Sequence, residues 1–345
     1  MDKKDIRSLS LDELKIEMES IGEKAFRAKQ VYEWLHTKLA DSFDEMTNLS
    51  KDLREKLDGA YRIPSVKMLE RQVSNQDGTN KFLFQLEDGN VVESVLMRYK
   101  HGNSVCISSQ VGCRMGCKFC ASTIGGKVRD LAPSEMLGQI YKIQKLSKER
   151  VHNVVVMGTG EPLDNYDNVM RAIEILTADW GFAWSPKRIT LSTIGVLPTL
   201  KRYLDECRCH LAVSLHNPFA DERLSVMPAQ KAWPVQEVID LIRKYDFTGQ
   251  RRVSFEYTMF AGFNDTKAHA DALIRMLRGL ECRMNLIRFH KIPDFPYETS
   301  PDVIMENFKT RLNNSGIMTT IRASRGEDIL AACGMLAGEH RDKNI

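Results

Sequence analysis

Apolar, β-rich runs alternate with helical patterns through most of the sequence, and this alternation constrains the fold more than any other feature. Helical periodicity is clear at 134–146, 167–176, 235–245 and 267–280. Repeated βα units form a parallel sheet with right-handed crossovers. Six or seven units predict a full or partial β/α barrel rather than a Rossmann sheet, with the chemistry at the C-terminal ends of the strands. The runs with strand character are 104–108, 153–157, 188–193, 210–215, 252–259, 282–289 and 317–323.

Two smaller parts precede the expected barrel. Residues 1–62 show helical patterns, including a capping-box pair at Ser10 and Glu13. Alternating runs then flank the turn residues 88–90, which predicts a β-hairpin. We therefore expect an N-terminal helical accessory domain (1–62), a β-hairpin linker (63–100) and a barrel with a C-terminal segment (101–345).

The composition excludes several classes of protein. Of the 345 residues, 43% are hydrophobic and 28% are charged, as is typical of a globular chain. No stretch approaches the roughly 18 apolar residues of a membrane span, and the first residues contain no apolar signal core. We therefore expect a cytoplasmic protein that does not contact the membrane. The net charge of +3 is too small to indicate nucleic-acid binding by itself, so any basic surface must be local.

Three of the eight cysteines lie within eight residues, at Cys113, Cys117 and Cys120. In a cytosolic chain such crowding indicates metal binding or catalysis. Three thiolates can bind three irons of a 4Fe–4S cubane and leave the fourth iron open to chelate S-adenosylmethionine (SAM). A structural zinc site completed by Cys106 is the alternative, although zinc knuckles usually pair two CxxC hooks and this chain has one tight pair.

The segment from Cys106 to Cys120, CISSQVGCRMGCKFC, resembles the RlmN/Cfr family of radical SAM adenosine methyltransferases. The similarity runs from about Glu93 to the C-terminus, and the helical N-terminal part also fits. It implies an α/β fold: a partial (β/α)6-type radical SAM barrel, an RNA-binding helical domain and a catalytic cysteine near the C-terminus. The other matching strings are GTGEPL from Gly158, LST from Leu191, SLH from Ser214, NLI from Asn285 and RGEDILAACG from Arg325.

The resemblance implies two cofactors. One is a 4Fe–4S cluster held by Cys113, Cys117 and Cys120, and the other is SAM, of which two molecules are consumed per turnover. At His290, the last of the implied SAM contacts, the family commonly has asparagine. The imidazole of His290 can still donate or accept one hydrogen bond. The implied contacts are Gly160, Glu161, Ser192, Ser214, Leu215, His216 and His290.

Two further cysteines and a carboxylate receive roles from the same resemblance. Composition alone favours buried apolar cysteines at Cys106 and Cys333, as it does for the remaining three. The matching strings imply instead that one SAM methylates Cys333, and that Cys106 releases the methylated base as a transient disulfide forms. Glu93 matches the candidate proton acceptor, with a solvent-facing strand carboxylate as the alternative.

The implied substrates are an adenosine of 23S rRNA near the peptidyl-transferase centre and the adenosine just 3′ of the anticodon in certain tRNAs, both methylated at C2. C8 methylation of the Cfr type, which confers antibiotic resistance, is the alternative; Val111 and the stretch 120–126 look closer to the C2 type. An electron donor such as flavodoxin or ferredoxin and a monomeric state are also expected. Candidate phosphate contacts are Arg98, Lys100, His101, Lys127, Arg129, Arg251 and Arg252.

Two other functional classes compete with this interpretation. The interpretation as a zinc-stabilised RNA-binding protein without catalysis does not explain Cys333 or the motif at 158–161. Another radical SAM enzyme, such as a glycyl-radical activase, needs neither Cys106 nor Cys333.

Overall fold

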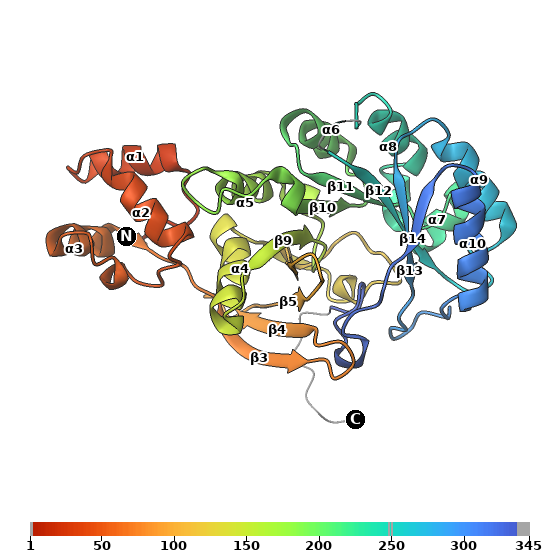
Figure 1. Ribbon diagram of the computed structural model, residues 1–345, viewed down its shortest axis with the longest axis horizontal. Helices are drawn as coiled ribbons and strands as arrows, with labels where there is room; N and C mark the ends of the chain where they lie inside the picture. Colours follow the sequence, from red (N-terminus) through yellow and green to blue (C-terminus); the bar gives the residue numbers. More distant parts are fainter. Residues whose placement is uncertain (1–2, 248, 250, 337–345) are drawn as a thin grey trace.

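The computed structural model describes residues 3–247, 249 and 251–336. Its N-terminal part contains three helices, which lie together at one end of the molecule (Figure 1). The capping box predicted at the first helix is present: Glu13 N donates to Ser10 Oγ at 3.2 Å, and Ser10 N donates to the Glu13 carboxylate at 2.8 Å. The elements are β1 (Lys4–Asp5), α1 (Leu11–Ser20), α2 (Arg27–His36), α3 (Lys51–Ala60) and β2 (Tyr61–Arg62), with β1 parallel to β2.

One ten-stranded sheet organises the rest of the chain. Seven of its strands are parallel neighbours and follow one another in chain order, as the βα alternation predicts. They are β6 (Asn103–Cys106), β9 (Val151–Val156), β10 (Ile189–Thr193), β11 (His210–Ser214), β12 (Val253–Met259), β13 (Arg283–Arg288) and β14 (Met318–Ile321).

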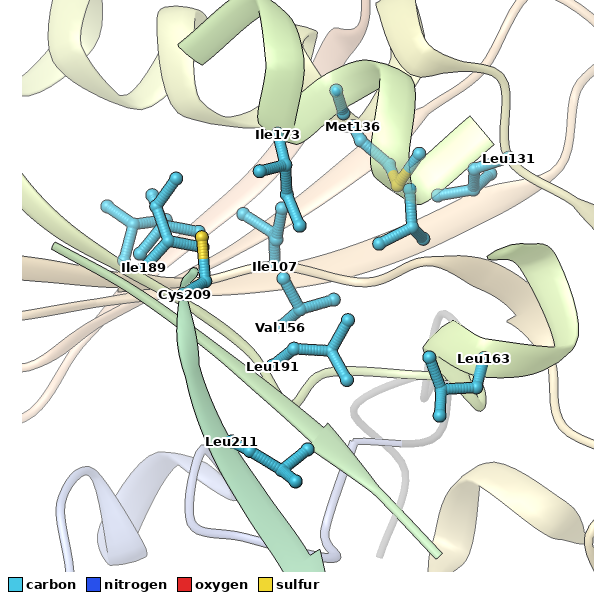
Figure 2. Packing of buried hydrophobic residues seen from close by; sticks show 14 of the residues in the cluster. Ile107, Leu131, Met136, Val156, Leu163, Ile173, Ile189, Leu191, Cys209 and Leu211 are labelled. Carbon is cyan, nitrogen blue, oxygen red and sulfur yellow. The ribbon is translucent and has the colours of Figure 1, made fainter. Parts of the chain in front are cut away.

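Helices follow the parallel strands and cover the sheet, with α9 and α10 at the end of the molecule opposite the N-terminal helices (Figure 1). Figure 2 shows how the core forms: Val156, Leu191 and Leu211, from successive strands, point into one apolar layer beneath Met136 and Ile173 of two helices. Buried parallel strands require such continuous apolar runs. The helices are α4 (Pro133–Ser147), α5 (Tyr166–Thr177), α6 (Leu197–Glu206), α7 (Ala220–Val226), α8 (Val235–Ile242), α9 (Lys267–Leu277) and α10 (Asp302–Asn314).

The segment expected to be a hairpin linker belongs to the main sheet. Strands β4 (Asn80–Gln85) and β5 (Val91–Met97) pair antiparallel as the predicted hairpin, and β3 (Lys67–Val73) adds a third antiparallel strand. Strand β5 then pairs antiparallel with β6, where Val95 lies opposite Cys106. This pairing corrects the picture of a separate linker, because it makes 67–97 the continuation of the barrel sheet. None of the helices within the described ranges is long and apolar enough to cross a membrane.

Candidate active site

The cysteine loop begins just beyond the C-terminal end of β6, where a parallel β/α sheet carries its chemistry. Strands β7 (Gln110–Gly112) and β8 (Lys127–Asp130) pair antiparallel at its base. Cys113 N donates to the Gly126 carbonyl at 3.0 Å. Gly112 has a φ of +71°, and a Cβ there would lie 1.9 Å from that same carbonyl oxygen, so only glycine fits.

The three thiols of this loop are largely withdrawn from solvent. Cys113 and Cys117 are buried and Cys120 is half-buried. Burial raises the pKa of Cys113 to about 12 and also raises the pKa values of Cys117 and Cys120. Buried thiols of this kind become thiolates when a soft metal centre supplies the compensating positive charge.

The donor set fits an iron–sulfur cluster better than a zinc ion. Across residues 3–247, 249 and 251–336, no three His, Cys, Asp or Glu side chains are arranged to hold a single metal ion. Cys106, the proposed fourth zinc ligand, lies on β6 rather than on the cysteine loop. Three soft donors on one loop match a cubane in which each thiolate binds a different iron.

A cavity of about 580 Å³ lies beside the cysteine loop at the C-terminal ends of the parallel strands. It brings together three predicted SAM contacts: Ser192 from β10, Ser214 at the end of β11, and His216, two residues beyond β11. Cys120 and Phe119 of the cysteine loop form another part of the wall. The cavity therefore lies directly against the third cysteine.

His216 is held as a neutral hydrogen-bond donor. Its Nδ1 accepts a hydrogen bond from Thr258 N at 2.9 Å, which leaves the ring proton on Nε2. Burial lowers the pKa of His216 to about 3. Its ring packs edge-on against Phe119 with centroids 4.9 Å apart, so the histidine also fixes the cysteine loop. The φ of +56° at His216 marks a backbone strained at a functional position.

The motif at 158–161 is tightly built into the protein. Both oxygens of the buried Glu161 accept hydrogen bonds, from Thr193 Oγ1 at 2.6 Å, Ile194 N at 2.9 Å and Leu163 N at 3.0 Å. Burial raises the pKa of Glu161 to about 7. A Cβ at Gly160 would lie 2.6 Å from Gln110 Cβ, so this glycine permits close packing on the segment before the cysteine loop. Neither Gly160 nor Glu161 lines the cavity, and their contact with SAM stays a prediction.

Two other predicted SAM contacts also lie outside the cavity lining. The side chain of Leu215 is fully buried, and its backbone N donates to the Glu256 carbonyl at 3.0 Å. His290 lies between Ser324 Oγ, 3.1 Å from its Nε2, and the Glu327 carboxylate, 3.4 Å from its Nδ1. Leu215 is thus accounted for by packing and His290 by its polar partners, and contact of either residue with SAM stays a prediction.

Sequence reasoning missed two charged residues in the cavity wall, Glu256 and Arg322. Glu256 accepts a hydrogen bond from Asn285 Nδ2 at 2.8 Å, and its other oxygen lies 3.4 Å from Arg322 Nη1. A carboxylate inside the apolar run Val253–Met259 was the available signal, because a charge in a buried strand requires a partner or a ligand.

Cys106 and Cys333 line a second pocket that shares a wall with the first. Cys120, Met157 and Arg322 line both pockets, as does Cys333. Ala121 N donates to the Gly334 carbonyl at 2.8 Å, which docks the C-terminal segment onto the cysteine loop. Burial and the nearby Cys333 raise the pKa of Cys106 to about 12, whereas Cys333 is exposed.

Glu93 faces the side of the sheet that carries this second pocket. Alternate residues of a strand share a face, and Val95 and Met97 on β5 line the pocket. The Glu93 carboxylate is buried and lies 3.2 Å from Lys81 Nζ. This burial corrects the alternative of a solvent-facing carboxylate.

Comparison with known proteins decides the family. The model of the ribosomal RNA large subunit methyltransferase N-terminal domain matches residues 4–63, and the radical SAM superfamily model matches 107–274. A probable dual-specificity RNA methyltransferase RlmN of Lachnoclostridium phytofermentans is 50% identical over 345 residues, covering 100% of this chain and 97% of the relative. The chain belongs to the RlmN family. A relative of the same name from Porphyromonas gingivalis strain W83 is 50% identical over 329 residues, covering 95% of each chain.

A solved relative of this RlmN-family chain confirms the fold. A radical SAM methyltransferase from Sphaerobacter thermophilus superposes with a TM-score of 0.92 at 38% identity, covering 97% of this chain and 100% of that one. The protein is therefore a SAM-dependent radical methyltransferase with a 4Fe–4S cluster and SAM as cofactors. The readings as a zinc-stabilised binding protein and as a glycyl-radical activase are wrong.

Most of the predicted phosphate contacts of this RlmN-family chain are engaged within the protein. Arg98 forms a bidentate pair with Glu149, Arg129 pairs with Glu135 and Asp88, and Lys127 pairs with Asp130 and Asp164. Arg251 is buried and donates to the Leu204 carbonyl. These four residues therefore have structural roles, which corrects their prediction as phosphate contacts. The candidates that remain exposed are Lys100, His101 and Arg252.

Proposed function

We propose that the protein methylates C2 of an adenosine, in 23S rRNA near the peptidyl-transferase centre and in tRNAs at the position 3′ of the anticodon. The proposal includes a methyl group carried on Cys333 and its release by Cys106. One observation carries it: Cys106 and Cys333, 227 residues apart in sequence (333 − 106), line one pocket that shares Cys120 with the cavity of Ser192, Ser214 and His216.

The first step uses the exposed thiol. The Cys333 thiolate attacks the methyl carbon of one SAM, which forms an S–CH3 bond and breaks the sulfonium S–CH3 bond. The thiol proton passes to solvent, because Cys333 is exposed. Arg322 lines the pocket beside Cys333, and a negative charge at Cys333 raises the pKa of Arg322, so the pocket presents a guanidinium cation next to this sulfur.

The second step needs the methyl group close to the other cavity. A cluster held by Cys113, Cys117 and Cys120 would supply the electron that cleaves a second SAM, and the resulting radical would take a hydrogen atom from the S-methyl group. Ser192, Ser214 and the Nε2–H of His216 can hold that SAM, since all three line the cavity. Cys333 lines both pockets, so its methyl group can face either one.

The last step separates the base from the protein. After the methylene carbon has joined C2, the adduct would return one electron to the oxidised cluster and lose the C2 proton to a base, and the Cys106 thiolate then attacks the Cys333 sulfur. The C–S bond breaks, the carbon leaves with its electron pair and takes up a proton, and a Cys106–Cys333 disulfide forms. Two electrons from a cellular thiol reset the pair. Glu93, on the same face as the pocket, is the candidate acceptor for the C2 proton.

Binding of the RNA completes the proposal. The target adenine must leave its stack to reach a buried pocket, which suits a helical N-terminal domain that grips the surrounding RNA. We further propose that the protein acts as a monomer and takes its electrons from a flavodoxin- or ferredoxin-like donor.

Mass spectrometry of the product tests the function. The protein, reduced without oxygen, is incubated with a 23S rRNA fragment or an anticodon stem-loop and with SAM carrying a deuterated methyl group. The digested nucleosides are then compared with standards of 2-methyladenosine and 8-methyladenosine. Labelled 2-methyladenosine supports the proposal, whereas 8-methyladenosine identifies the Cfr-type reaction and unmodified adenosine in both RNAs contradicts it.

A further inference from the structure

Two stacked aromatic rings lie where the chain turns from β5 into β6, and a guanidinium group from the C-terminal segment packs on one of them. The ring centroids of Tyr99 and His101 lie 5.1 Å apart with an interplanar angle of 13°, so the rings are stacked. The guanidinium carbon of Arg325 lies over the Tyr99 ring, 5.1 Å from its centroid. Arg325, Tyr99 and His101 are called the stacked triad below. None of them takes part in the chemical steps described above.

Tyr99 connects the stacked triad to the apolar wall of the pocket that holds the two thiols. Tyr99 packs against the apolar cluster around Cys106, and its hydroxyl lies 3.5 Å from Met97 Sδ. Val95 and Met97 belong to the same cluster and line the pocket with Cys106 and Cys333. Tyr99 therefore packs behind the apolar residues that form one wall of this pocket.

His101 is the most exposed member of the stacked triad. Arg325 and Tyr99 are half-buried, whereas His101 and the adjacent Lys100 are exposed. The Lys100 ammonium forms no ion pair within the described residues, and neither does the imidazole of His101. A flat exposed ring fixed by a second ring and flanked by a free cation is typical of sites where proteins stack single-stranded RNA bases.

We propose that the stacked triad binds the RNA base next to the target adenine, an inference that rests on the proposed function. When the adenine enters the pocket, its neighbour loses a stacking partner. The outer face of His101 replaces that partner, and Lys100 contacts the phosphate that joins the two nucleotides. The neighbouring base thereby fixes how far the adenine reaches toward Cys106 and Cys333.

The experiment uses 2-aminopurine, a base whose fluorescence falls when it stacks. It replaces, one at a time, the nucleotide on either side of the target adenosine in an anticodon stem-loop. Wild-type protein is expected to quench the probe at one of the two positions. His101→Ala is expected to leave that probe bright and to weaken binding by about fivefold to a hundredfold, the range for loss of one base–aromatic stack.

Two rescue variants separate stacking from charge. His101→Phe returns a flat face and is expected to restore quenching, whereas His101→Lys returns only a cation and is expected to behave like alanine. Tyr245→Ala is the matched control. Tyr245 follows the C-terminal end of α8, which lies toward the N-terminal ends of the parallel strands, whereas the site lies at their C-terminal ends. Its variant should bind and quench as wild type does.

Two results overturn the inference: unchanged quenching and affinity in His101→Ala, or rescue by lysine but not by phenylalanine. The proposed function is scored separately, by mass spectrometry of the unlabelled stem-loop and of a 23S rRNA fragment. Methylation without any effect of His101 rejects the stacking site alone. Failure of wild-type protein to methylate either RNA rejects the proposed function, and the fluorescence still reports whether a base stacks.

Discussion

The two thiols that share a pocket differ in their surroundings, and the difference matches the order of the proposed steps. Cys333 is exposed and can meet a methyl donor first. Cys106 lies at the end of β6 with a pKa raised to about 12, so it stays protonated until a group in the pocket takes its proton. This order prevents the resolving thiol from competing for the methyl group.

Alkylation rates should therefore separate the two cysteines. In native protein without cluster or SAM, we expect iodoacetamide to modify Cys333 at least about tenfold faster than Cys106, because the thiolate is the reactive form. Peptide mass spectrometry over a time course measures both rates. Cys282, which is half-buried with a pKa raised to about 12, serves as a slow reference. Equal rates at Cys106 and Cys333 would contradict the assigned environments.

Glu93 and Lys81 form a buried pair whose members can be tested separately. Glu93→Gln leaves the Lys81 ammonium unpaired, and we expect the free energy of unfolding to fall by up to about 3 kcal/mol. Adding Lys81→Met should return most of that stability. If Glu93 accepts the C2 proton, the double variant remains defective in methyl transfer. A double variant that methylates RNA at the wild-type rate would assign Glu93 a structural role only.

At the scale of elements, the sequence was a good guide to the parallel strands and to the β4–β5 hairpin, but not to the pairing of that hairpin with the barrel sheet. Apolar runs such as 188–193 and 210–215 are bounded by polar turns, so each strand is encoded locally. Residues 67–97 show the same local pattern, but pairing of Val95 with Cys106 depends on a partner strand that the local pattern does not specify. The linker expectation failed for that reason.

The candidate site shows the same difference between features that are encoded locally and contacts that form only in the folded chain. The spacing of the three loop cysteines within eight residues predicted an iron–sulfur cofactor, which the family confirms, and their role as its ligands stays a prediction. Glu256 and Arg322 were missed because their contact joins β12 to the residue after β14, and such a contact exists only in the folded sheet. The glycines of the motif at 158–161 show another limit. A glycine in a loop can allow either close packing or the approach of a ligand, and the sequence alone does not distinguish the two. In the structure these glycines pack closely against neighbouring residues.

The β7–β8 hairpin should control whether the cysteine loop can hold a cluster. Gly112→Ala places a Cβ against the Gly126 carbonyl at a positive φ, and we expect the variant to lose most of the roughly four irons per chain. Gly125→Ala is the matched control, because a Cβ there meets nothing within 4 Å. Iron and sulfide analysis after anaerobic reconstitution gives the answer. Full iron in Gly112→Ala would show that the hairpin does not set the loop.

At the scale of the whole molecule, buried polar groups join the N-terminal helices to the barrel. Arg7 donates to the carbonyls of Pro64 and Ala40 and lies over the Tyr141 ring of α4. His36, at the end of α2, places its Nδ1 2.8 Å from the Tyr141 hydroxyl. The helical part is therefore fixed on α4, and α4 also meets the site, where Gln139 Nε2 donates to the Ser108 carbonyl.

This junction should weaken in acid. Burial lowers the pKa of His36 to about 3 from its ordinary 6.5. As the pH falls through 6.5, His36 therefore takes up a proton in the unfolded chain but stays neutral in the folded chain. The contribution of neutral His36 is therefore lost as the pH falls below 6.5. Between pH 7 and pH 5 we expect wild type to lose about 2 kcal/mol more unfolding free energy than His36→Gln, as urea titrations would show. An identical pH dependence in both proteins would mean that His36 titrates normally.

The pairing of Cys106 with Cys333 is the central claim, and a trapped intermediate tests it most directly. Cys106→Ala, reduced without oxygen and incubated with SAM and an RNA stem-loop, cannot release the base from Cys333. The account predicts a covalent protein–RNA species that survives denaturing gel electrophoresis, maps to Cys333 by mass spectrometry, and is absent from wild type and Cys282→Ala. Free 2-methyladenosine formed by Cys106→Ala at the wild-type rate, with no adduct, would contradict it.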